Sequence, residues 1–484
     1  MKKLLSISII FLLSASLLAQ QKTSGEETFK DAEFFFSSGE YEEALYLFLQ
    51  LTRDYPDNNN FHFRAGMSFL ELPGKERESI PYFEKAVQNT TLKYKDKDFQ
   101  IRQAPHHAWF YLGNAYRINN QLDKALESYE KFMDIRNFES TYNLRIVENE
   151  IAACQRAKII QDSPVQLEKQ NLGQEINSSS HNFQPVVNKD ETVMVFMQRQ
   201  RFYDAIMYSI KENGQWTKPI NITPQIGSDG EMVPTGISPD GKELLLVRKI
   251  SEDNGDIYYS RLEGTFWSKA TDLGKTINTI KNEDHASFSC DGSYIIFSSD
   301  RRGGYGKLDL YITKRLNDNT LDQPQNMGNT INTEEDETSA YLAMNDKLLY
   351  FSSSGHFNMG GFDIFFSEKT DNGWSEPVNI GFPLNTTGDN RFYQPVNKGN
   401  TGYANFFNQK ENLKEEDIYR IEITPQSKIQ LPEAKKLDKS FSLEVVDKET
   451  NKIFKIHYNR ATDEFTIENG EDINLEIKYS EQDK

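Results

Sequence analysis

Cysteine is scarce in this chain of 484 residues, which contains only Cys154 and Cys290. A disulfide framework and a cysteine-based zinc cluster both need more cysteines than this, so neither kind of site is possible. The two cysteines fall in segments that we predict to be different domains. We therefore expect two free, structural thiols, and a bridge between them is the alternative.

Positive charge is also in short supply. Lysine and arginine number 55 against 73 aspartate and glutamate residues, which gives a formal net charge of −18. Nucleic-acid binding rests on clustered lysine and arginine, so we expect no nucleic-acid partner. The seven histidines are scattered apart from His106 and His107, so the sequence predicts no metal site.

Sequence signatures of catalysis are missing as well. There is no Gly-x-Ser-x-Gly turn that would expose a nucleophilic serine, and no glycine-rich phosphate loop before a helix. The long segments are taken up by repeats, which leaves no room for a hydrolase domain. We therefore predict no catalytic residues, no cofactor and a protein that is not an enzyme.

A long apolar run occurs only at the N-terminus. Lys2 and Lys3 precede an apolar stretch over residues 4–18, which is followed by Ala19. About 15 apolar residues are too few for a membrane span, whereas this order is typical of a secretory signal peptide. The sequence predicts a signal peptide over residues 1–19 and an exported chain, with no transmembrane span after its removal.

Aromatic residues, by contrast, are abundant. They make up 12% of the chain, which favours ordered and partly β structure, and the length suits two or three domains. Residues 24–162 carry helical periodicity instead. Within them one segment has the W-x2-L-G-x2-Y spacing and three further residues in register, namely Trp109, Leu112, Gly113, Tyr116, Ala125, Tyr129 and Phe132.

This pattern resembles the 34-residue tetratricopeptide repeat, in which paired helices stack into a superhelix. Two weaker copies precede it, and residues 140–160 are predicted to form a capping helix. The resemblance implies peptide or protein binding on the concave side, and packing against the next domain is the alternative. On the third repeat that concave surface would include His107, Phe110, Asn114 and Arg117.

From about residue 163 the pattern changes to strand-like runs separated by turn residues. An Asp-Ile-Tyr-like element recurs at intervals of 52, 53, 54 and 54 residues. Asp-Gly turns precede it in two copies, and a tryptophan follows it in three. Four strands per unit at this period predict a β-propeller over residues 163–425, with five blades, or six as the alternative. The recurring aspartates are Asp204, Asp256, Asp309, Asp363 and Asp417.

The order of these elements also predicts how the ring closes. The Leu-Gly-x-x-Ile-Asn piece at residues 172–177 precedes the first unit, whereas similar pieces at 273–278, 327–332 and 380–385 lie between units. The propeller therefore begins with the last strand of a blade and ends one strand short. We expect the N-terminal strand to complete the final blade and to remove two sheet edges.

The Ser-Pro-Asp-Gly turn at residues 238–241 and the Phe-Ser-Ser-Asp-Arg-Arg-Gly-Gly stretch at 297–304 resemble the WD40-like (PD40-type) propeller repeat typified by TolB. The helical array followed by this propeller resembles bacterial cell-envelope proteins of the OmpA family. Such proteins often end in an OmpA-like domain, for which the segments of this chain leave no residues to spare, so peptidoglycan binding is not expected. The resemblance implies a periplasmic or outer-membrane-associated scaffold.

Residues 426–484 begin with a linker rich in lysine, glutamate and proline. Four later stretches alternate at period two, at residues 441–446, 453–458, 464–467 and 475–479. They predict a small β-rich segment. The expected fold class is therefore α+β: an α-solenoid, a β-propeller and a small C-terminal β extension.

Acidic groups precede the predicted inner strands, in loops that converge at one mouth of a propeller channel. A cation site or a surface for a basic partner needs such convergence, and a solvated rim on an acidic protein is the alternative. The recurring aspartates are expected to accept hydrogen bonds within their own blades. The candidate rim residues are His181, Glu231, Asp284, Asp336, Glu337 and Asp389.

Two repeat architectures without a catalytic constellation favour an interaction scaffold or adaptor of the cell envelope. It would bind other envelope proteins or peptides and support secretion or envelope assembly. The alternative is a propeller-based receptor or enzyme that binds a glycan, a peptide or a cation at the channel mouth.

Overall fold

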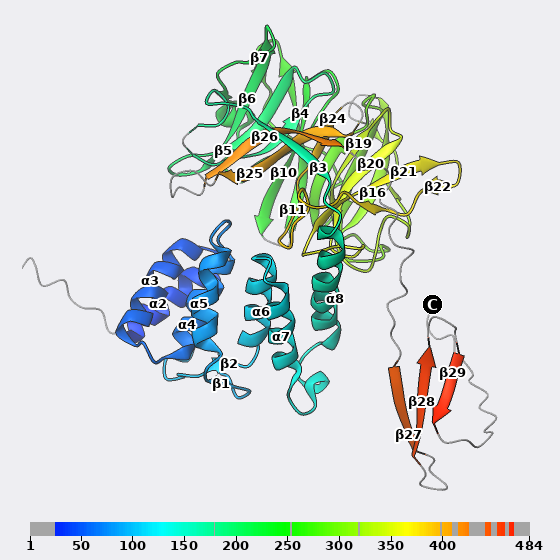
Figure 1. Cartoon of the computed structure of the whole chain (residues 1–484). Helices are drawn as coiled ribbons and strands as arrows, with labels where there is room; N and C mark the ends of the chain where they lie inside the picture. Colours follow the sequence, from blue (N-terminus) through cyan, green and yellow to red (C-terminus); the bar gives the residue numbers. More distant parts are fainter. Residues whose placement is uncertain are drawn as a thin grey trace, which may run out of the picture. The chain divides into compact units, whose positions relative to one another are not determined.

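The fold was analysed in a computed structural model of the chain (Figure 1). It describes residues 25–178, 180–251, 254–317, 320–396, 399–408, 415–424, 441–446, 453–459 and 464–468. The predicted signal peptide over residues 1–19 lies outside these ranges. Residues up to Pro425 form one compact unit, and residues from Gln426 form a second.

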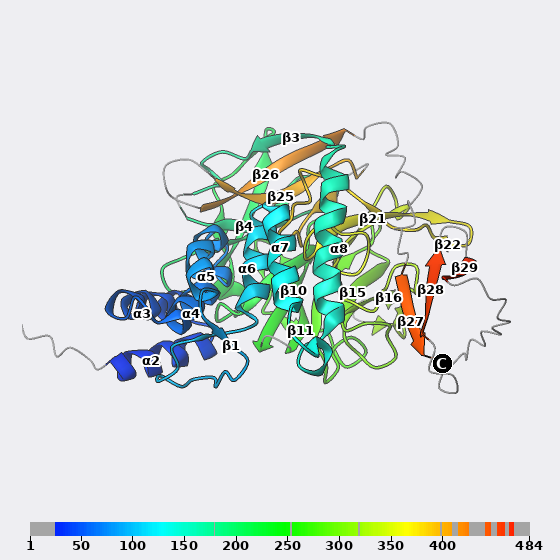
Figure 2. The same cartoon turned by 60° about the horizontal axis from the view of Figure 1, so that its bottom comes forward.

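The N-terminal part of the first unit consists of helices, with a long connection over residues 87–107 between α5 and α6 (Figure 1, blue to cyan). Figure 2 shows α6, α7 and α8 side by side. Two short 3-10 helices and one two-stranded ladder interrupt the array. The helices are α2 (Gly25–Ser37), α3 (Tyr41–Asp54), α4 (Asn59–Leu70), α5 (Ile80–Ala86), α6 (Ala108–Ile118), α7 (Leu122–Met133) and α8 (Leu144–Gln161); the other elements are η1 (Glu76–Ser79), η2 (Phe138–Ser140), β1 (Thr90–Thr91) and β2 (Ala104–Pro105).

The helices pair because glycine on one helix makes room for an aromatic ring on the next. Gly113 of α6 lies directly under the ring of Tyr129 of α7, and a Cβ there would overlap that ring. Gly66 of α4 has the same relation to Phe83 of α5. Tyr129 and Phe83 are fully buried as a result, so each pair closes around one large side chain.

Five four-stranded blades follow, as the repeat count predicts, and the six-blade alternative is not observed. In blades 1–4 the outermost strand is split into two short pieces that both pair with the third strand. Blade 1 holds β4 (Asn182–Val187), β5 (Val193–Arg199), β6 (Asp204–Glu212), β7 (Gln215–Trp216) and β8 (Ile220–Asn221); blade 2 holds β9 (Met232–Ile237), β10 (Glu243–Ser251), β11 (Asn254–Glu263), β12 (Phe266–Trp267) and β13 (Thr271–Asp272). Blade 3 holds β14 (Glu283–Phe288), β15 (Tyr294–Ser299), β16 (Asp309–Asn317), β17 (Thr320–Leu321) and β18 (Gln325–Asn326); blade 4 holds β19 (Glu337–Ala343), β20 (Leu348–Ser353), β21 (Asp363–Thr370), β22 (Gly373–Trp374) and β23 (Val378–Asn379). A four-residue helix, α9 (Thr223–Ile226), lies between blades 1 and 2.

Blade 5 closes the ring with strands from both ends of the propeller. Its order is β24 (Gln394–Val396), β25 (Thr401–Asn408), β26 (Glu415–Thr424) and then β3 (Gln166–Asn171). Thus β3, which directly follows the helical array, is the predicted closing strand. The inner strands β4, β9, β14, β19 and β24 contact one another around a closed circle.

The Leu-Gly-x-x-Ile-Asn motif forms the loop after the outer strand rather than part of that strand. Its asparagine side chain binds both backbone groups of one residue in the third strand, as an extra piece of ladder would. Asn332 accepts from the Leu310 N–H at 2.8 Å and donates to the Leu310 C=O at 3.0 Å. Asn385 does the same to Ile364. The isoleucine of the motif, which is Leu384 in the copy at residues 380–385, is buried, so each loop is anchored at two points.

The second unit is described as three antiparallel strands, β27 (Phe441–Val446), β28 (Ile453–Asn459) and β29 (Glu464–Glu468). The fourth predicted stretch, residues 475–479, lies outside the described residues. Within the described part of the chain, none of the helices combines the length and apolar composition that a membrane span requires.

Candidate functional site

The two faces of the propeller differ in what they contact. Because strands alternate in direction, the loops that precede the inner strands and the loops between second and third strands share one face. Here we call it the proximal face, since α6 and α8 pack on it. The opposite face carries the turns between first and second strands, at residues 188–192, 238–242, 289–293 and 344–347, and is called the distal face.

Polar and apolar contacts fix the helical array to the proximal face. Arg145 of α8 forms ion pairs with Glu334 at 2.8 Å and Glu335 at 2.9 Å. Arg156 of α8 donates to the Asn358 carbonyl at 2.7 Å. Met359, from the loop between β20 and β21, is fully buried in the core of the helical array. The array and the propeller therefore share part of a hydrophobic core.

The four residues predicted on the concave helical surface all have partners within the chain. His107 lies among Phe63, Tyr111 and Tyr142, and burial lowers the pKa of its imidazole to about 4. Asn114 accepts from the Tyr129 hydroxyl at 2.8 Å, and Phe110 packs on the same ring.

Arg117 is the one of these four that reaches the propeller. Its side chain is buried, pairs with Glu150 at 2.6 Å and donates to the carbonyl of Thr387. The alternative interpretation, in which the array packs against the next domain, is thus realised at this residue.

The predicted rim residues lie on the proximal side of the ring, and most of them have local side-chain contacts. Asp284 accepts from the Thr338 hydroxyl at 2.9 Å, and Asp336 accepts from the Leu308 N–H at 2.9 Å. Asp389 accepts from Phe362 N–H at 3.2 Å, His181 packs on Phe407, and Glu231 is exposed. Within the described residues, no group of three or more histidine, cysteine or carboxylate side chains is placed to hold a metal.

Glu337 is the exception, because it is fully buried inside blade 4. It accepts hydrogen bonds from the Thr333 N–H, the Thr333 hydroxyl and the Ser353 hydroxyl. Burial nevertheless raises the pKa of this carboxyl to about 7. Glu283 binds Thr279 and Ser299 in the same way in blade 3, so this acid anchors the loop before the inner strand.

The distal face is hollowed at its centre by a cavity of about 560 Å³, which we call the axial funnel. Every blade contributes to its wall at the end of its inner strand, which places the cavity on the ring axis. Its described lining is largely apolar, as ligand-sized pockets generally are. The lining residues are Val187, Lys189, Gly236, Ile237, Pro239, Ser287, Phe288, Ser289, Cys290, Tyr341, Leu342, Ala343, Met344, Asn345, Gln394, Pro395 and Val396.

A buried polar link lies at the inner end of the funnel. The Tyr341 hydroxyl of blade 4 donates to the Thr235 carbonyl of blade 2 at 3.0 Å. His285 of blade 3 contacts the same hydroxyl through Nε2 at 3.0 Å, so this nitrogen is the donor and carries the proton. Burial lowers the pKa of His285 to about 4, which keeps the ring neutral. Because blades 2 and 4 are not neighbours, Tyr341 spans the inner face of blade 3.

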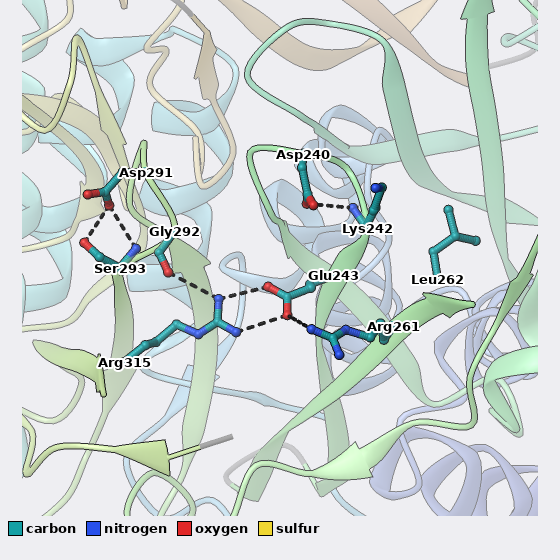
Figure 3. A pocket seen from close by; sticks show the side chains of 9 residues that line it. All are labelled: Asp240, Lys242, Glu243, Arg261, Leu262, Asp291, Gly292, Ser293 and Arg315. Atoms are coloured by element: carbon teal, nitrogen blue, oxygen red, sulfur yellow. Dashed lines mark hydrogen bonds and ion pairs between the residues drawn. The ribbon is translucent and has the colours of Figure 1, made fainter. Parts of the chain in front are cut away.

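A second hollow on the distal face, of about 520 Å³, lies between blades 2 and 3 (Figure 3). Arg315 of blade 3 binds the carboxylate of Glu243 in blade 2 with both terminal nitrogens, at 2.9 and 3.1 Å. Arg261 approaches the same carboxylate at 3.4 Å. Burial opposes ionisation, but hydrogen bonds from Arg315 and Tyr259 hold the pKa of Glu243 below its usual value.

These charges satisfy one another, so the hollow is best described as a clasp between blades. A similar clasp joins blades 1 and 5, where Arg420 lies 2.7 Å from Glu191 and the Tyr403 hydroxyl donates to the same carboxylate.

The funnel was not predicted from the sequence. The acidic residues before the inner strands indicated the proximal mouth, whereas the funnel is lined by residues at the opposite ends of these strands. A usable signal was present: the last residue of each inner strand, directly before its turn, is apolar, as in Ile237 and Phe288.

No family model and no curated protein matches the chain. Among solved structures, TolB from Acinetobacter baumannii matches at 14% identity with a TM-score of 0.31, covering 52% of this chain and 56% of TolB. An α-L-arabinofuranosidase from Podospora anserina, in complex with cellotriose, matches at 11% identity and 0.34, covering 54% and 98% of the two chains. A prolyl endopeptidase structure matches at 11% and 0.27, covering 61% and 47%.

These matches correct one expectation. We expected a protein that is not an enzyme because repeats fill the chain, yet arabinofuranosidases and prolyl endopeptidases are among the proteins whose structures match. The expectation that a chain filled with repeats is not an enzyme was wrong, because the fold of a protein does not decide its function. At such low similarity the matches assign no activity and no residue role to this chain.

Proposed function

We propose that this chain is an interaction scaffold of the bacterial cell envelope, exported to the periplasm or to the outer membrane. Its propeller binds a partner polypeptide on the distal face while the helical array occupies the proximal face. The export and envelope parts of the proposal rest on the N-terminal apolar run and on the repeat resemblances. The supporting observation for the binding face is the axial funnel, which is lined by all five blades and faces away from the array.

A site-specific crosslinking experiment tests this proposal in cells that produce the full chain. A photoreactive amino acid is placed at Lys242 or Tyr294, which are solvent-accessible on the distal side, and at Lys281 on the proximal side as the control. We expect a discrete crosslinked partner from the distal positions. The same crosslink should disappear when Cys290→Trp fills the funnel.

Crosslinking from Lys281 alone, or distal crosslinks that persist with Cys290→Trp in a folded protein, would contradict the proposal. Folding of the variant is checked by its circular dichroism spectrum and its thermal midpoint.

A further inference from the structure

We propose that the axial funnel binds the C-terminal end of a partner polypeptide, with the last, bulky apolar side chain inside the funnel and the terminal carboxylate on Lys189. This inference rests on the proposed function and specifies what the distal face recognises. It follows from three properties of the funnel: its walls, its closed inner end and the single charge among its described lining residues.

The walls select an apolar side chain. Val187, Ile237, Phe288, Ala343 and Val396 hold the same place at the ends of the five inner strands, and all are buried. Met344 extends the apolar wall to the rim, where it is 47% exposed. Moving a leucine or phenylalanine side chain from water into such surroundings is favourable, because it removes apolar surface from water.

The closed inner end excludes a chain that threads through the ring. The Tyr341 side chain reaches from blade 4 to the Thr235 carbonyl of blade 2, and His285 supports it from blade 3. Both side chains are buried, at 4% and 3% exposure. A polypeptide can therefore dip a side chain into the funnel from the distal side but cannot pass beyond it.

The charge at the rim selects a carboxylate. Lys189 is the only charged residue among the described residues of the lining. Its ammonium group lies 3.5 Å from the amide oxygen of Asn345, and no carboxylate of the described chain lies within 4 Å of it in an ion pair. Asp190, the next residue on the same turn, is exposed. One carboxylate at the mouth of an apolar cavity fits this arrangement.

Backbone chemistry favours a polypeptide over a lipid. The five inner strands are terminal strands of their sheets, so their axial edges carry backbone N–H and C=O groups outside any described ladder. Some are satisfied by side chains, such as the Val187 N–H, which donates to the Gln394 amide oxygen at 2.6 Å. The amides of a bound peptide can pair with the others, whereas an alkyl chain would leave them desolvated and unpaired.

The chain carries its own reporter for occupancy of the funnel. Cys290 lines the cavity and is partly exposed, while Cys154, the other cysteine, is fully buried in the helical core. Burial raises the pKa of the Cys290 thiol to about 11, so alkylation is slow and conveniently followed at pH 9. The alkylation of Cys290 by iodoacetamide, read by peptide mass spectrometry, therefore measures access to the funnel.

The test compares two hexapeptides whose last two residues are leucine and then phenylalanine. One has a free C-terminal carboxylate and the other has a C-terminal amide. We expect the free acid to slow alkylation of Cys290 saturably and to bind at least about tenfold more tightly than the amide. In Lys189→Gln, the free-acid peptide should bind only as tightly as the amidated peptide does. Lys242→Gln, which removes an exposed lysine from the next turn of the same face, should leave the difference intact.

Three results would overturn the inference. Equal protection by acid and amide would mean that the funnel accepts internal apolar side chains, and stronger protection by decanoate would mean a lipid. Failure of any peptide to protect Cys290, while Lys242 still crosslinks a partner, would remove the inference and leave the proposed function standing. The proposed function fails separately if the distal crosslinks are absent.

Discussion

At the scale of single residues, the aspartates that open the third strands of blades 3 and 4 organise the loops before them. In blade 3, Asp309 accepts from the N–H groups of Tyr305 and Gly306 and from the Asn326 amide. In blade 4, Asp363 accepts from Met359 N–H and from the Asn379 amide through one oxygen. Its other oxygen is buried and has no hydrogen-bond partner in the described structure.

The buried carboxylate oxygen without a partner in the described structure makes the stability contribution of Asp363 depend on pH. Burial raises the pKa of its carboxyl to about 7, although Arg117 and Arg156 lie near it. Because the folded pKa exceeds the unfolded one, the contribution of Asp363 to stability is complete below about pH 4 and is lost as the pH rises through 7. Asp363→Asn should reduce the fall in stability over this range, by up to about 1.4 kcal/mol per pH unit for one proton.

The measurement is the thermal midpoint of the wild type and of Asp363→Asn between pH 4 and pH 7. Asp204→Asn, at the same repeat position but partly exposed in blade 1, is the matched control and should follow the wild type. Parallel curves for the wild type and Asp363→Asn would contradict the assignment.

At the scale of elements, the features predicted from the sequence were those that depend on neighbouring residues or on a regular repeat interval. The Asp-Gly turns marked the first hairpin of two blades, and both glycines, Gly241 and Gly292, adopt positive φ. The 52-to-54-residue interval predicted the number of blades. The split outer strands were missed, because pieces of two residues carry no periodicity. The role of the motif asparagines was also invisible, since it depends on a strand that is distant along the chain.

Closure by β3 predicts a specific sensitivity. Leu167 packs from β3 against the core between blades 4 and 5, whereas Glu168, the next residue, is exposed. Leu167→Asp should lower the free energy of unfolding by about 1–3 kcal/mol, because it places a charge against that core. Glu168→Ala should change it by less than about 0.5 kcal/mol. Urea unfolding followed by tryptophan fluorescence measures both variants, and equal midpoints would count against β3 as the closing strand.

At the scale of the whole molecule, the first unit depends on a few side chains that cross from helix to propeller. None of these contacts has a sequence pattern, because each joins residues that lie far apart, such as Arg156 and Asn358. The axial funnel was unpredictable for the same reason: its wall is assembled from five strand ends that are only brought together by ring closure.

Met359 offers a direct test of this coupling. Met359→Asp should place a charge in the helical core and cost roughly 3–5 kcal/mol, while Met344→Asp on the distal face should cost far less. We expect scanning calorimetry to show helices that melt separately from the propeller in Met359→Asp only. A single unchanged transition in that variant would mean that the array and propeller are not coupled through this side chain.

The register of the closing strand has a mechanical consequence. Gln166, where β3 begins, is paired with Thr424, where β26 ends, and the ladder runs from this pair to Asn171 and Tyr419. Tension applied to the chain on either side of the propeller therefore pulls on the same end of the ladder. The hydrogen bonds are loaded one after another, as in an opening zipper, so this seam yields at lower force than a ladder sheared along its length.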